Sequence, residues 1–174
     1  QGPGDLTIDG TFDWISGTQT GPGDTIITAA GSATFSPNGF DLNLRGGRDL
    51  VNHGAIEAVS GSLVLFQSAV PQTIENDGTF ELSGSFNLVS QCCYNVPAFD
   101  PDVVFFHNTG TLTKTSDVAV QSIGIPFDND GTVTVEAGRL TFSGGDQSST
   151  SGTFDATADG TSVEFGFSGY TLTS

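Results

Sequence analysis

Seven glycines recur along the chain at nearly constant intervals, and this spacing constrains the fold more than any other feature. Five of the six intervals are 21 to 24 residues long, and the remaining one is 32 residues long. A period in the low twenties is typical of solenoids, in which successive coils of chain stack and bury a shared core. The sequence therefore predicts a stack of coils that begin at Gly10, Gly31, Gly54, Gly78, Gly110, Gly131 and Gly152.

The residues after each repeat glycine alternate between apolar and polar side chains, as in a β-strand that buries one face. At the second and fourth positions, thirteen of fourteen side chains are apolar, and the exception is Lys114. Because a lone buried cation is costly, we expect either a slip of strand register at Lys114 or a contact with a carboxylate such as Asp117. The seven segments read GTFDW, GSATF, GAIEA, GTFEL, GTLTK, GTVTV and GTFDA.

Two further apolar segments in most coils predict a second and a third strand. A second turn glycine precedes SLVLF, SFNLV, RLTFS and TSVEF, whereas DLVN, QTIEN, VVFFHN and IPFDN lead into the next coil. No helical periodicity is evident. The chain is therefore predicted to be all-β, a single-stranded parallel β-helix (β-solenoid) of about seven coils of 21–24 residues, wound right-handed. Residues 1–174 are expected to form a single domain.

An asparagine precedes four of the repeat glycines by two residues. Asn and Gly tolerate the left-handed backbone conformation that a sharp corner requires, so these pairs predict structural turns. Stacked in register, the amide side chains would form a ladder that bonds each coil to its neighbours. A role as ligands is the alternative. The residues are Asn52, Gly54, Asn76, Gly78, Asn108, Gly110, Asn129 and Gly131.

The chain is strongly acidic, with twenty Asp and Glu, four Lys and Arg, and a net charge of −16. Such a chain repels nucleic acid and anionic lipid, so no nucleic-acid partner is expected. No apolar stretch reaches the roughly 20 residues that span a bilayer, so no membrane span is expected either. The chain begins at Gln1 without a signal-peptide pattern and ends inside an apparent strand. We therefore expect a processed product or a fragment of a longer repeat protein.

The one long interval contains an insertion loop, QCCYNVPAFDPD, at residues 91–102. Insertions in solenoids map to loops on one face, which is often the face that binds a ligand. Cys92, Cys93, Tyr94 and Phe99 are therefore candidate binding residues, and a loop without a binding role is the alternative. The adjacent cysteines either form a vicinal disulfide, which suits an extracellular setting, or remain two thiols.

Two pairs of nearby carboxylates are candidate calcium ligands, namely Asp100 with Asp102 and Asp128 with Asp130. Calcium binds six to eight oxygens, commonly from carboxylates and carbonyls in a turn. The chain has neither an EF-hand loop nor a glycine-rich nonapeptide run, and its cysteines lack the spacing of a zinc site. We therefore expect no metal and no cofactor, with calcium as the alternative.

The sequence offers little catalytic machinery, so no catalytic residue is assigned. A lyase for acidic polysaccharides needs cations to neutralise the uronate, whereas this chain has only four Lys and Arg. A hydrolase of the pectinase kind pairs two aspartates, but its Gly-His-Gly and Arg-x-Lys stretches are missing here. A Ser-His-Asp site would depend on His53 or His107, and neither accompanies a nucleophile elbow. Outward Thr-x-Thr pairs suggest an ice-binding face, although carboxylates interrupt that array.

The repeat unit is similar to a known type of surface protein. FDNDGTVTVEAGRLTFSGG at residues 127–145 and DLVNHGAIEAVSGSLVLF at residues 49–66 resemble the repeats of large bacterial secreted and cell-surface proteins, the β-helical adhesins and autotransporter passengers. The resemblance covers nearly the whole chain except the insertion, and its motif contains no catalytic residue. It implies surface fibres, stalks and adhesion, and therefore an extracellular location.

The expected function is a non-enzymatic structural segment of an extracellular surface fibre or adhesin. Open strand edges at both ends would pair with copies of the chain or with neighbouring repeats, including end-to-end stacking into filaments. A glycan or a cell-surface receptor is a further expected partner. The alternatives are a β-helix that binds or degrades carbohydrate and, third, an ice-binding solenoid.

Overall fold

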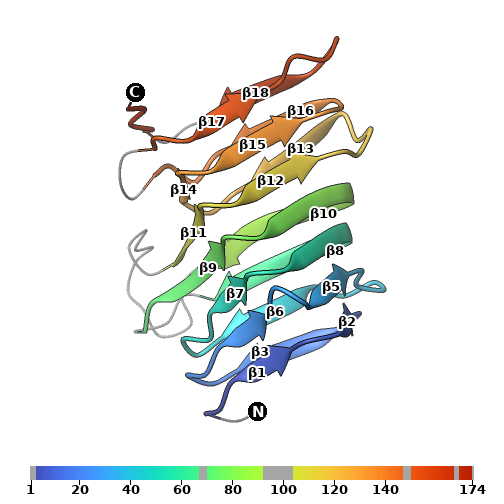
Figure 1. The fold of residues 1–174 in the computed structure, drawn as a ribbon, viewed down its shortest axis with the longest axis vertical. Coiled ribbons are helices and arrows are strands. Elements are labelled where there is room, and N and C mark those ends of the chain that lie inside the picture. The colour runs from blue at the N-terminus through green and yellow to red at the C-terminus, as the bar shows by residue number, and fades with distance from the viewer. Residues whose placement is uncertain (1–2, 67–69, 92–103, 147–149, 167–168, 174) are drawn as a thin grey trace.

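The computed structural model describes residues 3–66, 70–91, 104–146, 150–166 and 169–173, and within these ranges the chain is all-β, without a helix. The chain winds into a stack of coils with the N-terminus at one end and the C-terminus at the other (Figure 1). Every strand pairing among the described residues is parallel. The predicted β-solenoid is therefore confirmed.

One face of the solenoid is a six-stranded sheet, formed by the strands that lead from one coil into the next. These strands coincide with the third segments predicted from the sequence. Neighbouring strands keep a regular register over the face, so each side chain lies above its counterpart in the previous coil. The strands are β1 (Leu6–Ile8), β4 (Thr25–Ile27), β7 (Leu50–Asn52), β9 (Gln72–Asn76), β11 (Val104–Asn108) and β14 (Phe127–Asn129).

The other two faces belong to one twelve-stranded sheet, because two long strands turn the corner between them. These strands continue through Gly61 and Gly84, where the sequence predicts a turn between separate strands. Between Leu82 and Ser85 the register shifts, so a β-bulge bends the chain without ending the strand. The strands are β2 (Thr11–Trp14), β3 (Gly17–Thr20), β5 (Ser32–Phe35), β6 (Leu42–Arg45), β8 (Ala55–Phe66), β10 (Thr79–Gln91), β12 (Thr111–Lys114), β13 (Val120–Ile123), β15 (Thr132–Val135), β16 (Arg139–Phe142), β17 (Thr153–Asp155) and β18 (Ser162–Phe165).

The stack contains about six complete coils rather than the predicted seven. The repeat glycines precede seven strand segments on one face, but the third face has six strands in the described residues. The last coil reaches that face only through an isolated bridge between Thr150 and Leu172. Because a coil is complete only when the chain returns along the third face, counting glycines gives one coil too many. Right-handed winding stays a prediction.

A hydrophobic core runs through the centre of the stack, and aromatic rings contact one another along its whole length. The contacts lead from Phe12 in the first coil to Tyr170 in the last, with ring centroids 4.5 to 6.4 Å apart. Each such pair contributes roughly 0.5–1.5 kcal/mol beyond the area that it buries. The inward positions predicted from the alternation are buried, apart from partly buried ones in the first and last coils.

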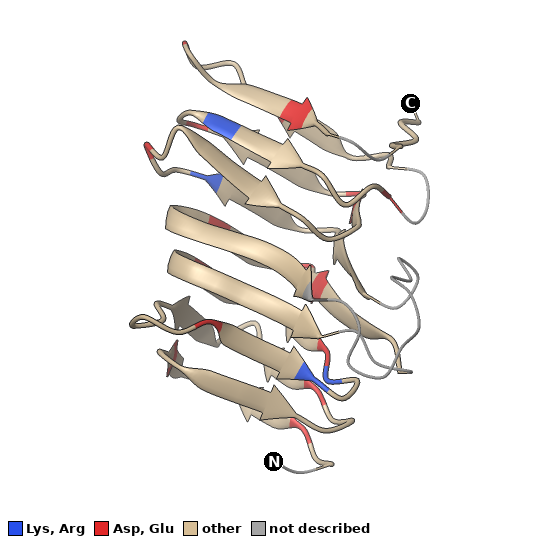
Figure 2. Cartoon of the chain, turned by 180° about the vertical axis from the view of Figure 1, so that it is seen from behind, with Lys and Arg blue, Asp and Glu red and all other residues tan. Residues whose placement is uncertain are grey.

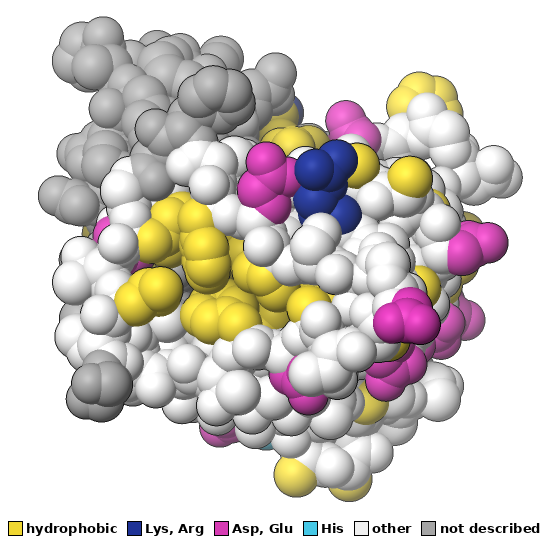
Figure 3. Space-filling model, turned by 90° about the horizontal axis from the view of Figure 1, so that it is seen from above, with side chains coloured by type: hydrophobic (Ala, Val, Ile, Leu, Met, Phe, Trp, Pro, Cys, Tyr) yellow, Lys and Arg dark blue, Asp and Glu magenta, His cyan; other side chains and the backbone are white. Residues whose placement is uncertain are grey.

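At the C-terminal end of the stack, the core is left partly uncovered by the described residues. Seen along the stack from that end, hydrophobic side chains gather at the centre of the surface (Figure 3). The apolar side chains of the last coil are only partly buried, in contrast to their counterparts in the middle of the stack. They are Phe154, Ala156, Val163, Phe165 and Tyr170.

The repeat glycines are required by close contact between coils, not by a left-handed backbone. None of them is among the glycines with positive φ, so the predicted conformational reason is wrong. A Cβ atom on Gly110 would lie only 2.2 Å from the carbonyl oxygen of Gly78 in the preceding coil. The equivalent positions from Gly31 to Gly152 show the same close approach, whereas a Cβ on Gly10 in the first coil meets nothing within 4 Å.

Replacing Gly110 by alanine is therefore expected to lower the free energy of unfolding by about 2–3 kcal/mol, because the methyl group overpacks rigid backbone. Gly10→Ala is the matched control and is expected to be nearly neutral. Urea unfolding followed by circular dichroism measures both values. Equal effects of the two substitutions would show that the contact between coils is not the reason for the repeat.

Lys114 occupies its inward position in regular register, paired with Leu82 on one side and Val135 on the other. The predicted register slip is therefore wrong. The ammonium group donates to three backbone carbonyls and not to Asp117. Because these three acceptors match the three donors of an ammonium group, the cation is accommodated without a hydrogen bond to a carboxylate, and Asp117 stabilises its charge only through space.

Candidate functional site

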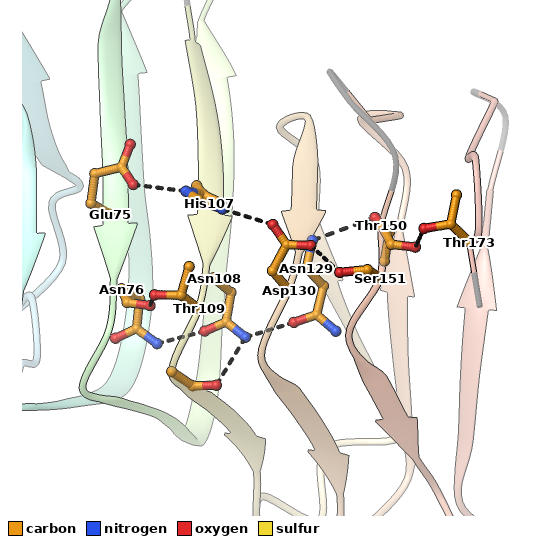
Figure 4. Close-up of polar contacts among 11 residues, drawn as sticks. Glu75, Asn76, His107, Asn108, Thr109, Asn129, Asp130, Thr150, Ser151 and Thr173 are labelled. Atoms are coloured by element: carbon orange, nitrogen blue, oxygen red, sulfur yellow. Dashed lines mark hydrogen bonds and ion pairs between the residues drawn. The ribbon is translucent and has the colours of Figure 1, made fainter.

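Four asparagines form a ladder of side-chain amides along one corner of the solenoid. Each is the last residue of a strand in the six-stranded face, and each is at most 1% exposed. The Nδ2 of each donates to the Oδ1 of the next, over 2.6, 2.6 and 2.7 Å. Figure 4 shows the part of the ladder from Asn76 to Asn129. The same nitrogens also donate to a backbone carbonyl of the next coil, at 2.9 to 3.4 Å. The members are Asn52, Asn76, Asn108 and Asn129.

A second row of polar contacts lies beside the ladder, on the outer side of the same corner (Figure 4). The Nδ1 atom of His107 lies 3.0 Å from a carboxylate oxygen of Glu75, and its Nε2 atom lies 3.2 Å from one of Asp130. The hydroxyl group of Ser151 donates to the other oxygen of Asp130. One continuous row therefore joins four successive coils.

The electrostatics of this row favour a charged imidazole. Partial burial of His107 opposes protonation, but the hydrogen bonds to Asp130 and Glu75 outweigh it and raise the pKa of the ring above its ordinary value. The hydrogen bond from Ser151 and that from His107 lower the pKa of Asp130. The row therefore favours the protonated form of His107, which lies between two carboxylates.

The order of these groups does not match a nucleophilic triad. In such a triad the histidine takes the proton of the serine, and a carboxylate orients the histidine. Here Ser151 donates to Asp130, and His107 contacts carboxylates on both sides. The other histidine, His53, has its Nδ1 atom 2.8 Å from both carboxylate oxygens of Asp77. The arrangement links coils and positions no serine for attack.

The carboxylates of the calcium candidates Asp128 and Asp130 are not jointly available to a cation. Asp128 is 5% exposed within β14, whereas the carboxylate of Asp130 is occupied by His107 and Ser151. Within the part of the chain that the structure describes, no group of three or more His, Cys, Asp or Glu side chains is arranged to hold a metal ion. Asp100 and Asp102 lie outside the described residues.

Acidic residues recur along the stack, whereas basic residues are few (Figure 2). Of the four Lys and Arg, Lys114 and Arg48 are buried. Arg45 is exposed with its guanidinium 3.6 Å from the centre of the Phe66 ring, and Arg139 forms a 3.0 Å ion pair with Glu164. The surface is therefore even more acidic than the composition suggests.

A shallow depression of about 560 Å³ lies on the outer face of the strands that follow the repeat glycines. Glu57 and Glu81 stack in register within it, and Glu136 also lines it. Ser83 donates to Glu57 and Thr115 to Glu81, each over 2.7 Å, so hydroxyl groups from the next coil orient both carboxylates. The depression combines fixed carboxylates with hydroxyl groups, as in surfaces that hydrogen-bond polar ligands.

Sequence reasoning did not identify this depression. The available signal was Ala55, which occupies an outward position that Thr or Ser fills in the other coils. Its small side chain leaves room between its register partners Ser32 and Thr79, which also line the hollow. The same outward face shows that carboxylates interrupt the threonine array in the folded chain, since Glu57 and Glu81 stand in register with Thr34 and Thr113.

The insertion loop lies outside the described residues except for Gln91, the last residue of β10. Its candidate binding residues, Cys92, Cys93, Tyr94 and Phe99, lie outside the described residues. The strands on either side of it, β10 and β11, are described and pair with the coils next to them.

No helix of the described ranges has the length and apolar character needed to cross a membrane.

Comparison with known proteins gives no further guidance, since no family model, no curated protein and no solved structure matches the chain. The resemblance to bacterial surface repeats therefore stays a prediction from the sequence.

Proposed function

We propose that the chain is a non-enzymatic structural segment of an extracellular surface fibre or adhesin. The single observation that carries this proposal is the continuity of its interior. Parallel strand pairing joins each coil to the next, the aromatic contacts run from the first coil to the last, and the asparagine ladder joins four successive coils. A chain organised this way resists separation of its coils, which is the property that a stalk or fibre needs.

The open C-terminal end supports association with further coils, either of neighbouring repeats or of a second copy. Its apolar side chains are partly buried, and β17 and β18 each pair on one side only among the described residues, so this end offers hydrogen bonds and hydrophobic surface to an added strand. Leu172, which is 60% exposed in the last turn, lies at this end.

The purified chain is therefore expected to form rods that lengthen with protein concentration, seen by electron microscopy and analytical ultracentrifugation. Leu172→Asp is expected to shorten them, because it places a charge on the associating end. Phe40→Asp is the matched control, since Phe40 is 76% exposed in the turn between β5 and β6. A chain that stays monomeric at every concentration, or equal effects of the two substitutions, would contradict end-to-end association.

Carbohydrate binding is the second candidate, favoured by the depression around Glu57 and Glu81. Carboxylates held by Ser83 and Thr115 are fixed acceptors for sugar hydroxyl groups. The same preparations distinguish the two functions: glycan binding that is lost in Glu81→Gln, without rods, would favour this candidate over the fibre.

A further inference from the structure

We propose that His107 is an acid-strengthened clamp between coils, whose protonated ring joins β9 to the turn after β14 and loosens when the ring loses its proton. This inference does not depend on the proposed function. It stands on the position of one imidazole between two carboxylates that belong to the coils on either side of it (Figure 4).

The geometry distinguishes the two protonation states of the ring. A protonated imidazole has two N–H donors, whereas a neutral one has a single donor and a lone pair on the other nitrogen. With Glu75 on one side and Asp130 on the other, only the protonated ring donates to both. The neutral ring directs a lone pair at one of the carboxylates, which repels it.

The surroundings reinforce this preference. Glu75 on β9 and Asp128 on β14 are the register partners of His107, and Asp130 follows in the next turn. All three of these neighbours are acidic. The carboxylate in the turn after β9, Asp77, is bound to His53.

The clamp also bridges the part of the stack that contains the insertion. It joins β9 to β11, the strands on either side of the longest repeat interval. Their register partners Glu75 and His107 are 32 residues apart in the sequence. From there it reaches Asp130 in the following coil. A change of charge at one ring therefore acts on both sides of the coil that carries the insertion.

The direction of the pH effect follows from the contacts. Because the pKa of His107 is raised on folding, its stabilisation is complete below the unfolded value of about 6.5 and is lost as the pH rises through the higher folded value. The pKa of Asp130 is lowered, so its carboxylate stays charged throughout this window. The clamp is therefore closed below the unfolded value of about 6.5 and weakens as the pH rises through the folded pKa of His107.

Nuclear magnetic resonance of the ¹⁵N-labelled imidazole rings in the wild-type chain tests the clamp directly. The titration midpoint of His107 is expected above about 6.5, the value of an unfolded histidine. Asp130→Asn is expected to lower that midpoint. A midpoint at or below 6.5, or one that Asp130→Asn leaves unchanged, overturns the proposal.

Thermal unfolding provides the matching stability measurement. Lowering the pH from about 8.5 to about 5.5 is expected to raise the melting temperature of the wild type by about 2–4 °C more than that of His107→Gln, the shift that an exposed ion pair gives in a chain of this length. His53→Gln is the control, because His53 contacts a single carboxylate, to which a neutral ring can donate with its one N–H. This variant is expected to show the same change of melting temperature with pH as the wild type. Identical pH dependence of the wild type and His107→Gln overturns the proposal.

Discussion

Replacing Asn108 by alanine is expected to lower the free energy of unfolding by about 3–4 kcal/mol, one of the two largest effects that this structure predicts. Asn108 stands inside the ladder, where it accepts from Asn76 over 2.6 Å and donates to Asn129 over 2.7 Å. Without it, the Oδ1 of Asn129 loses its amide donor and Asn76 loses an acceptor, both in a site that water does not reach. Unmade hydrogen bonds are most costly in such a low-dielectric interior.

Two further substitutions separate the ladder from a general effect of losing an amide. Asn52 is the first member of the ladder, because its register partner in the preceding coil is Ile27. Asn52→Ala therefore interrupts only one contact between amides and is expected to cost less than Asn108→Ala. Asn38→Ala, at an exposed turn position, is expected to be nearly neutral. Chemical denaturation gives all three values. A cost at Asn108 no larger than at Asn38 would show that the ladder does not stabilise the stack.

The repeat and its buried face could be predicted from the sequence because they depend on local patterns. Alternation after Gly78 or Gly131 specifies which side chains point inward, and an asparagine at a constant offset specifies the ladder once coils stack in register. The physical role of the glycines could not be obtained in this way. A left-handed turn and a close approach of backbone both favour glycine, and the φ angles of the repeat glycines and the distance from Gly110 to the preceding coil distinguish them.

The row around His107 shows why the candidate site was harder to predict. Its members are 32, 23 and 21 residues apart in consecutive contacts, and the first of these separations spans the insertion. No local pattern pairs Glu75 with His107; the pairing depends on how the long coil returns to its face. The depression depends in the same way on one small residue, Ala55, among larger neighbours in other coils. Such sites arise from register between coils, and the repeat determines that register only where no insertion intervenes.

Lys114 is the second residue where a large effect is expected, because an ammonium group is fully enclosed in the stack. Its side chain is 0% exposed, and its Nζ atom donates to the carbonyls of Ser116, Val118 and Ala137 at 2.6, 2.9 and 2.6 Å. Burial lowers the pKa of this lysine, which is the cost of removing the charge from water. The three carbonyls belong to the loop after β12 and the turn before β16, so one cation fixes two neighbouring segments of backbone.

Lys114→Met is therefore expected to lower the free energy of unfolding by about 3–5 kcal/mol, although methionine has nearly the same length and suits an apolar position. The substitution removes the charge but leaves three carbonyls without their donor, in one buried and two partly buried contacts. Removing only one partner of such a polar contact costs more than removing both. Arg139→Met is the matched control, since that exposed cation pairs with Glu164 and is expected to cost less than about 1 kcal/mol. Equilibrium unfolding in urea measures both. If Lys114→Met were as stable as the wild type, the cost of burying the ammonium group would cancel the gain from its three hydrogen bonds. Lys114 would then not contribute to the stability of the stack.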